Sequence, residues 1–148
     1  MRSNRGVTNK NRTIGLILTI VVCFLYGCSA IGTQVAESKR IALTGSQENS
    51  GTFKQGMLTI DYNFRLSGDN ITLSGKVGYF GGVDSLDVRV LFFDQQGTVI
   101  EQKMVYSVPY RKGADSWGGR NFEKELKVPA NAAGFTFDYS SQDRRNKG

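Results

Sequence analysis

The sequence contains no histidine among its 148 residues. Histidine is the commonest general base and the commonest metal ligand in proteins, so its absence removes both groups at once. Nucleophile systems of the Ser-His-Asp and Cys-His types are excluded, and so is a zinc site of ordinary type. We therefore predict that the protein is not an enzyme and that it uses no cofactor and no metal.

Cysteine is almost as scarce, because Cys23 and Cys28 are the only two. Both lie near the N-terminus, so the chain after Cys28 has no disulfide and no thiol chemistry. Roughly 120 residues are enough for one domain that buries about 65% of its unfolded surface. We expect a single domain that is stabilised by its hydrophobic core alone.

An excess of positive charge is also missing from most of the chain, although the formal net charge is +6. Four of the 19 basic residues are Arg2, Arg5, Lys10 and Arg12, which leaves 15 basic against 13 acidic residues, a net of +2. The remaining basic residues are scattered, so no nucleic-acid partner is predicted. Residues 143–148 are interpreted as a solvated basic C-terminal tail.

The chain has one long apolar run, over residues 13–27, and it follows a basic start that contains no acidic residue. This order is typical of a secretory signal segment. A membrane-spanning helix needs about 20 apolar residues, and this run is shorter. An uncleaved membrane anchor and ordinary secretion after signal removal remain the alternatives.

The stretch Leu25–Cys28 resembles the bacterial lipobox, although Tyr26 is larger than the residue usual at its position. The resemblance implies that residues 1–27 are a lipoprotein signal peptide and that Cys28 becomes the lipidated first residue. Two or more acyl chains anchor a protein stably. Ser29 in place of Asp resembles the sorting signal for the outer membrane, which implies a periplasm-facing location there. Residues 28–36 are interpreted as a lipidated tether.

Residues 57–66 carry the clearest period-2 pattern in the chain, which is typical of a half-buried antiparallel strand. Further strands are predicted over 37–44, 71–79, 86–93, 98–108, 120–128 and 135–139, and residues 45–56 are predicted to be a loop. Residues 86–93 are apolar on both faces, which predicts a central strand or a covered outer face. Ser67–Asn70 and Asp94–Gly97 read as hairpin turns, the second closed by a residue in the left-handed region.

Seven short strands about ten residues apart predict an all-β domain over residues 37–142: a single antiparallel β-sandwich, immunoglobulin-like, with a barrel as the main alternative. Leu86–Gly97 resembles a hairpin of small immunoglobulin-like domains in prokaryotic surface proteins, such as the FxLYD type. Lys127–Pro129 and Phe135–Tyr139 are similar to their last two strands. The resemblance implies a fold and carries over no functional residues.

The loop at 109–120 is the best candidate for a binding site. Its candidate ligand-binding residues are Tyr110, Arg111, Lys112, Asp115, Trp117 and Arg120. An aromatic plate beside Arg and Asp can hold a sugar or an anionic polymer by stacking and charge-assisted hydrogen bonds. Alternatively, Trp117 folds back to cover an open end of the sandwich, since large aromatic side chains are mostly buried.

Two groups of carboxylates are interpreted as structural. Asp84, Asp87 and Asp94 lie at opposite ends of one predicted strand and are too few at either end for a calcium shell. Glu123 and Glu125 share one strand face, as paired glycosidase carboxylates can, but lysines surround them on the expected solvent side.

These observations predict a lipid-anchored, noncatalytic β-sandwich that acts as an accessory or binding module of the bacterial cell envelope. Its partners would be the membrane, through the lipid on Cys28, and an envelope protein. Apolar groups on the mixed faces of 86–93 and 98–108 would meet that protein, or an edge strand would pair with it. The alternative is binding of peptidoglycan, another glycan or a lipid headgroup through the 109–120 loop.

Overall fold

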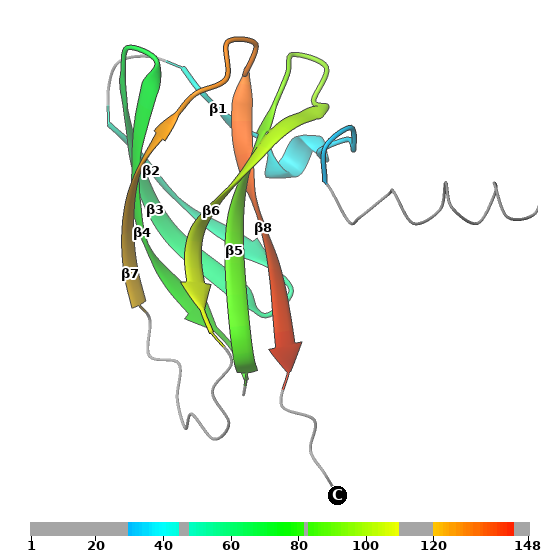
Figure 1. Cartoon of the computed structure of the whole chain (residues 1–148), viewed down its shortest axis with the longest axis vertical. Coiled ribbons are helices and arrows are strands. Elements are labelled where there is room, and N and C mark those ends of the chain that lie inside the picture. The colour runs from blue at the N-terminus through cyan, green and yellow to red at the C-terminus, as the bar shows by residue number, and fades with distance from the viewer. Residues whose placement is uncertain (1–29, 45–47, 82, 110–119, 144–148) are drawn as a thin grey trace, which may run out of the picture.

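The computed structural model describes residues 30–44, 48–81, 83–109 and 120–143, which form eight strands and one short 3₁₀ turn (Figure 1). The 3₁₀ turn η1 spans Glu37–Lys39. The strands are β1 (Ile41–Ala42), β2 (Asn49–Gln55), β3 (Leu58–Ser67), β4 (Asn70–Tyr79), β5 (Val83–Phe93), β6 (Val99–Val108), β7 (Arg120–Lys127) and β8 (Gly134–Asp143).

The described strands form two four-stranded sheets, in the orders β1-β8-β5-β6 and β2-β3-β4-β7, and every pairing is antiparallel. The prediction of an all-β antiparallel sandwich is thereby confirmed. The β3–β4, β5–β6 and β7–β8 turns lie at one end of the sandwich, and β4, β6 and β8 end at the other (Figure 1). No strand pairing links one described sheet to the other.

Two strand pairings, one in each sheet, follow the pattern of immunoglobulin domains. Consecutive strands β4 and β5 lie in different sheets and pair with β7 and β8, which are also consecutive. Strands B and C of immunoglobulin domains are joined to E and F in the same way. The place that strand G occupies there, beside F, is taken here by β1, which comes first along the described chain.

Most predicted strands agree with the structure, because burial of one face produces an alternating pattern. The predicted turn at 94–97 is confirmed in detail. The amide of Gly97 donates to the Asp94 carbonyl oxygen at 2.9 Å, and Gly97 has a φ of +87°. The Asp94 carboxylate accepts from the backbone amides of Gln96 and Thr98 at 3.0 and 2.9 Å.

The expectation of a loop over 45–56 is wrong, because Asn49–Gln55 form β2 and pair with β3 along its full length. Its residues are mostly polar because β2 is an edge strand with little inward surface. Phe53 is its one buried side chain and lies opposite Ile60 in the register. The first predicted strand, 37–44, is reduced to the two residues of β1, because η1 occupies its beginning.

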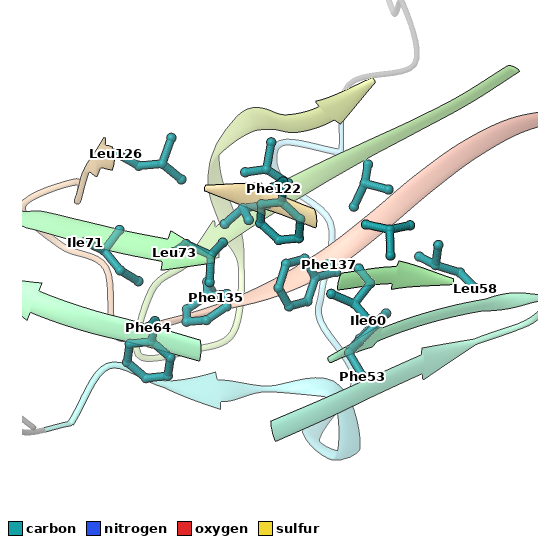
Figure 2. Packing of buried hydrophobic residues seen from close by; sticks show 14 of the residues in the cluster. Phe53, Leu58, Ile60, Phe64, Ile71, Leu73, Phe122, Leu126, Phe135 and Phe137 are labelled. Atoms are coloured by element: carbon teal, nitrogen blue, oxygen red, sulfur yellow. The ribbon is translucent and has the colours of Figure 1, made fainter. Parts of the chain in front are cut away.

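The core lies between the sheets and is rich in aromatic side chains. Figure 2 shows Phe135 and Phe137 of β8 meeting side chains of the opposite sheet. The Phe137 ring lies 5.4 Å from the ring of Phe53, and the Phe135 ring lies 5.2 Å from that of Phe64 in an edge-on arrangement. Tyr62 contacts both β8 rings, at 6.2 and 5.4 Å. Aromatic pairs prefer such tilted and edge-on geometry.

A second, smaller apolar cluster lies on the outer face of the β1-β8-β5-β6 sheet. Val35 packs there against Leu91, Phe93 and Val99, with Ala30 beside them. This explains why β5 is apolar on both faces: it is a central strand, and the chain's own segment 30–36 covers the end of its outer face. Apolar groups expected to meet a partner at this position are therefore already buried.

The segment 30–36, which the sequence indicates as part of a tether, is hydrogen-bonded to the β5–β6 hairpin. The amide of Gly32 donates to Val99 O at 2.8 Å, and the amide of Val99 donates to Thr33 O at 2.9 Å. Gln34 forms a β-bridge with Thr98, and Arg40 donates from Nε to Val35 O at 3.0 Å. Residues 30–36 are therefore docked on the folded domain.

Replacement of Phe53 by alanine tests whether β2 is part of the core. Phe53 is only 6% exposed, so we expect Phe53→Ala to lower the free energy of unfolding by about 3 kcal/mol. The matched control is Lys54→Ala, at the next and exposed position of the same strand, which should change it by less than about 0.5 kcal/mol. Equal unfolding midpoints of Phe53→Ala and the unchanged protein in urea would contradict the assignment.

Candidate functional site

Most of the residues that the sequence singles out for binding lie outside the described residues. These are Cys28, Tyr110, Arg111, Lys112, Asp115 and Trp117. The two ends of the loop are described: β6 ends at Val108, followed by Pro109, and β7 begins at Arg120. Both ends lie at the end of the sandwich where β4 and β8 also finish (Figure 1).

Arg120, at the start of β7, lies close enough to Tyr106 of β6 for its charge to act on the phenol. Its register partner on β4 is the buried Val77, and its position falls on the same face of β7 as those of Phe122 and Leu126. Burial raises the pKa of the Tyr106 phenol above its ordinary value of 10.0, and the positive charge of Arg120 partly lowers that pKa again. Of the predicted ligand-binding residues, Arg120 is the one whose surroundings the structure describes.

A hollow on the outer face of the other sheet is lined by described residues. This polar hollow has a volume of about 770 Å³ and crosses all four strands of the β2-β3-β4-β7 sheet. Its lining residues are Ser50, Gly51, Thr52, Asp61, Tyr62, Asn63, Ser74, Gly75, Lys76, Asn121, Phe122 and Glu123. Hydroxyl, amide, carboxylate and ammonium groups predominate, so the surface suits a polar ligand.

Strand register brings the polar hollow together. One row across the sheet is Ser50, Asn63, Ser74 and Glu123, and the next row is Thr52, Asp61, Lys76 and Asn121. The Thr52 hydroxyl donates to the Asp61 carboxylate at 2.7 Å. At the edge, Arg65 forms an exposed ion pair with Glu48 at 3.2 Å.

Gly75 lies in the floor of the polar hollow, at a position where the neighbouring atoms leave no room for a side chain. A Cβ atom at this position would lie 2.7 Å from Asp61 O and 2.8 Å from the ring of Phe122. The ring of Phe122 therefore occupies the inner space that a side chain at 75 would take. No outward aromatic side chain is part of the lining, since Tyr62 and Phe122 reach it from the inner face.

The carboxylates that suggested calcium or acid–base chemistry have ordinary partners or positions. Asp94 caps its own turn, and Asp87 accepts a hydrogen bond from the Ser107 hydroxyl at 2.6 Å. Glu123 lines the polar hollow, and Glu125 accepts from the Asn70 amide at 3.0 Å. In the described part of the chain, no three Asp, Glu, Cys or His side chains gather where a metal ion would bind.

Phe80 and Met57 form an exposed apolar pair that sequence reasoning missed. Phe80 is 84% exposed and Met57 49%, and the Phe80 amide donates to Met57 O at 2.9 Å. They flank the start of β3 and the end of β4, so strand pairing places them together. The sequence signal was Phe80 standing directly before Gly81 and Gly82, outside any strand whose core could bury it.

Comparisons of the chain with protein-family models, with curated proteins and with solved structures find no match. No helix within the described ranges is long and apolar enough to cross a membrane.

The effect of the Arg120 charge on Tyr106 can be tested by titration. Because the Arg120 charge favours the phenolate, Arg120→Gln should raise the pKa of Tyr106 further above 10.0. A raised pKa means that the neutral phenol stabilises the fold below pH 10.0 and that this contribution is lost as the pH rises through the folded-state pKa. Carbon NMR of the tyrosine ring measures the shift.

The control for this titration is Lys124→Gln, an exposed position four residues along the same strand. It should leave the Tyr106 titration unchanged. An unaltered Tyr106 pKa in Arg120→Gln would show that the two side chains do not interact.

Proposed function

We propose that the protein is a lipid-anchored, noncatalytic binding module of the bacterial cell envelope, attached to the outer membrane through Cys28 and facing the periplasm. The lipobox-like stretch Leu25–Cys28 and the signal-like segment before it support the anchor. The lack of histidine in the chain, and of any cysteine after Cys28, supports a noncatalytic role.

One structural observation carries this proposal furthest: residues 30–36, which follow Cys28 closely in the sequence, are docked on the folded domain. A lipid on Cys28 would hold a domain docked in this way close to the membrane. Within the described residues, the buried core is built from strands β2 to β8.

Attachment through Cys28 can be tested with the full-length chain in a Gram-negative host. We expect the protein to incorporate labelled palmitate and to lose residues 1–27, and we expect Cys28→Ser to incorporate none. Cys23→Ser is the matched control, because Cys23 lies inside the apolar run and should leave labelling unchanged. Radiolabelling and intact-protein mass spectrometry provide the readout. Equal palmitate incorporation by Cys28→Ser would refute attachment at this residue.

The polar hollow favours a second function, the binding of a glycan such as peptidoglycan. Its two rows place hydroxyl, amide and carboxylate groups beside Lys76 over four strands, and sugars are recognised by such convergent donors and acceptors. The 109–120 loop, with Trp117, is the other candidate surface for a glycan or a lipid headgroup. Its last residue, Arg120, is followed on β7 by Asn121 of the polar hollow.

Sedimentation with purified sacculi separates these two surfaces. If the polar hollow binds, Lys76→Ala should weaken binding about tenfold, because a charge-assisted hydrogen bond contributes about 1.5–3 kcal/mol. Lys54→Ala, which removes an exposed lysine outside the lining, is the control. If instead only Trp117→Ala weakens binding, the loop is the glycan site. No sedimentation of the unchanged protein would exclude both.

A further inference from the structure

Ala30, the first of the described residues, is held in place by apolar packing and by hydrogen bonds. Ala30 packs against the cluster of Val35, Leu91, Phe93 and Val99. Its carbonyl oxygen accepts from the amide of Thr33 at 3.1 Å and from the Thr33 hydroxyl at 2.6 Å. Residues 30–33 thus form a closed turn on the outer face of the β1-β8-β5-β6 sheet.

Only Ser29 stands between this turn and Cys28. Consecutive Cα atoms are about 3.8 Å apart, so the Cα atoms of Cys28 and Ala30 are separated by at most about 7.6 Å. A flexible tether of eight residues, ending at 36, would have reached roughly 28 Å. The headgroup layer on each side of a bilayer is about 5–8 Å thick. The linkage is therefore no longer than the headgroup layer.

We propose that the lipid on Cys28 holds the turn Ala30–Thr33, with the exposed side chain of Ile31, within the headgroup region of the bilayer. This inference rests on the proposed lipidation of Cys28. Ile31 is 54% exposed and occupies the second position of the turn. An apolar side chain at that position suits the boundary between headgroups and acyl chains, where it would leave water.

This arrangement sets the orientation of the domain. The turn lies beside the end of β5 that carries Leu91, whereas Phe80 precedes the other end of β5. At about 3.3 Å per residue, Leu91 and Val83 are roughly 25 Å apart along the strand. Lys76 lies on the outer face of the opposite sheet. Phe80 and the polar hollow should therefore stand clear of the bilayer.

The exposed pair Phe80 and Met57 offers a competing orientation. Both side chains are apolar and exposed, and they flank the end of β4, which lies at the opposite end of the sandwich from the β5–β6 turn (Figure 1). A domain on a long tether would be free to insert that end into the membrane. A linkage of one residue favours the orientation in which Ile31 meets the bilayer. The two orientations can be distinguished by which positions the lipid protects from a water-soluble reagent.

Site-directed spin labelling of the lipidated full-length protein tests the inference. After processing, Cys28 carries lipid and the chain has no other cysteine, so each introduced thiol is labelled alone. Labels at Ile31→Cys, Phe80→Cys and Lys76→Cys are compared in phosphatidylethanolamine–phosphatidylglycerol vesicles. We expect collisions with a water-soluble nickel complex to fall several-fold at position 31 relative to positions 76 and 80. Circular dichroism confirms that each labelled protein is folded.

A linker variant provides the matched control. Eight Gly and Ser residues inserted between Ser29 and Ala30 leave the lipobox and the turn intact. Position 31 should then regain access to the nickel complex while the protein stays in the vesicles. Protection that persists would contradict the short linkage as its cause.

The remaining outcomes separate the inference from the proposed function. A mass spectrum without lipid on Cys28 would overturn both. A lipidated protein whose label at 31 is as accessible as that at 76, or whose label at 80 is the protected one, would overturn the orientation alone.

Discussion

The contacts of Phe135 and Phe137 with the opposite sheet are the interaction on which the rest of the structure depends. No disulfide or described strand pairing joins the two sheets, so their relative position rests on side-chain packing. The two rings of β8 reach Phe53, Tyr62 and Phe64, which come from β2 and β3. Each such pair adds about 0.5–1.5 kcal/mol beyond its buried area. The Ala30 turn lies on the outer face of one sheet and the polar hollow on that of the other. The same contacts therefore also set the position of these two features relative to each other.

The outer face of β5 shows how a local sequence feature acquires a different meaning in the fold. Leu91 and Phe93 looked like apolar groups available to a protein partner. Val35 covers them instead, and Arg40 lies over the Phe93 ring at 5.8 Å while it donates to Val35 O. The chain therefore buries this apolar surface with its own residues. A partner would have to bind elsewhere, and the described surfaces that remain accessible include Phe80, Met104 of β6, the polar hollow and the edge of β2.

The sequence predicted the sandwich and most of its strands because one-sided burial leaves a period of two, as in β3, where Leu58, Ile60 and Phe64 all face the core. It failed at β2, whose single core residue, Phe53, produces no period. It also missed the docking of Val35, because a single apolar residue in a polar stretch gives the same sequence pattern in a docked segment as in a free tether. The polar hollow was beyond reach for another reason: Ser50, Asn63, Ser74 and Glu123 are neighbours only through the register of four strands.

Anchoring and ligand binding would use opposite outer faces of one rigid sandwich. The Ala30 turn lies on the β1-β8-β5-β6 sheet and the polar hollow on the β2-β3-β4-β7 sheet, with the core between them. Packed sheets are about 10 Å apart, and the side chains of each outer face add to that separation. A short linkage at Cys28 would then place the polar hollow at a nearly constant height above the bilayer and directed toward the periplasm. A long tether would lose that placement, so with the proposed anchor the docking of Val35 would serve the presentation of the opposite face as well as the burial of its own.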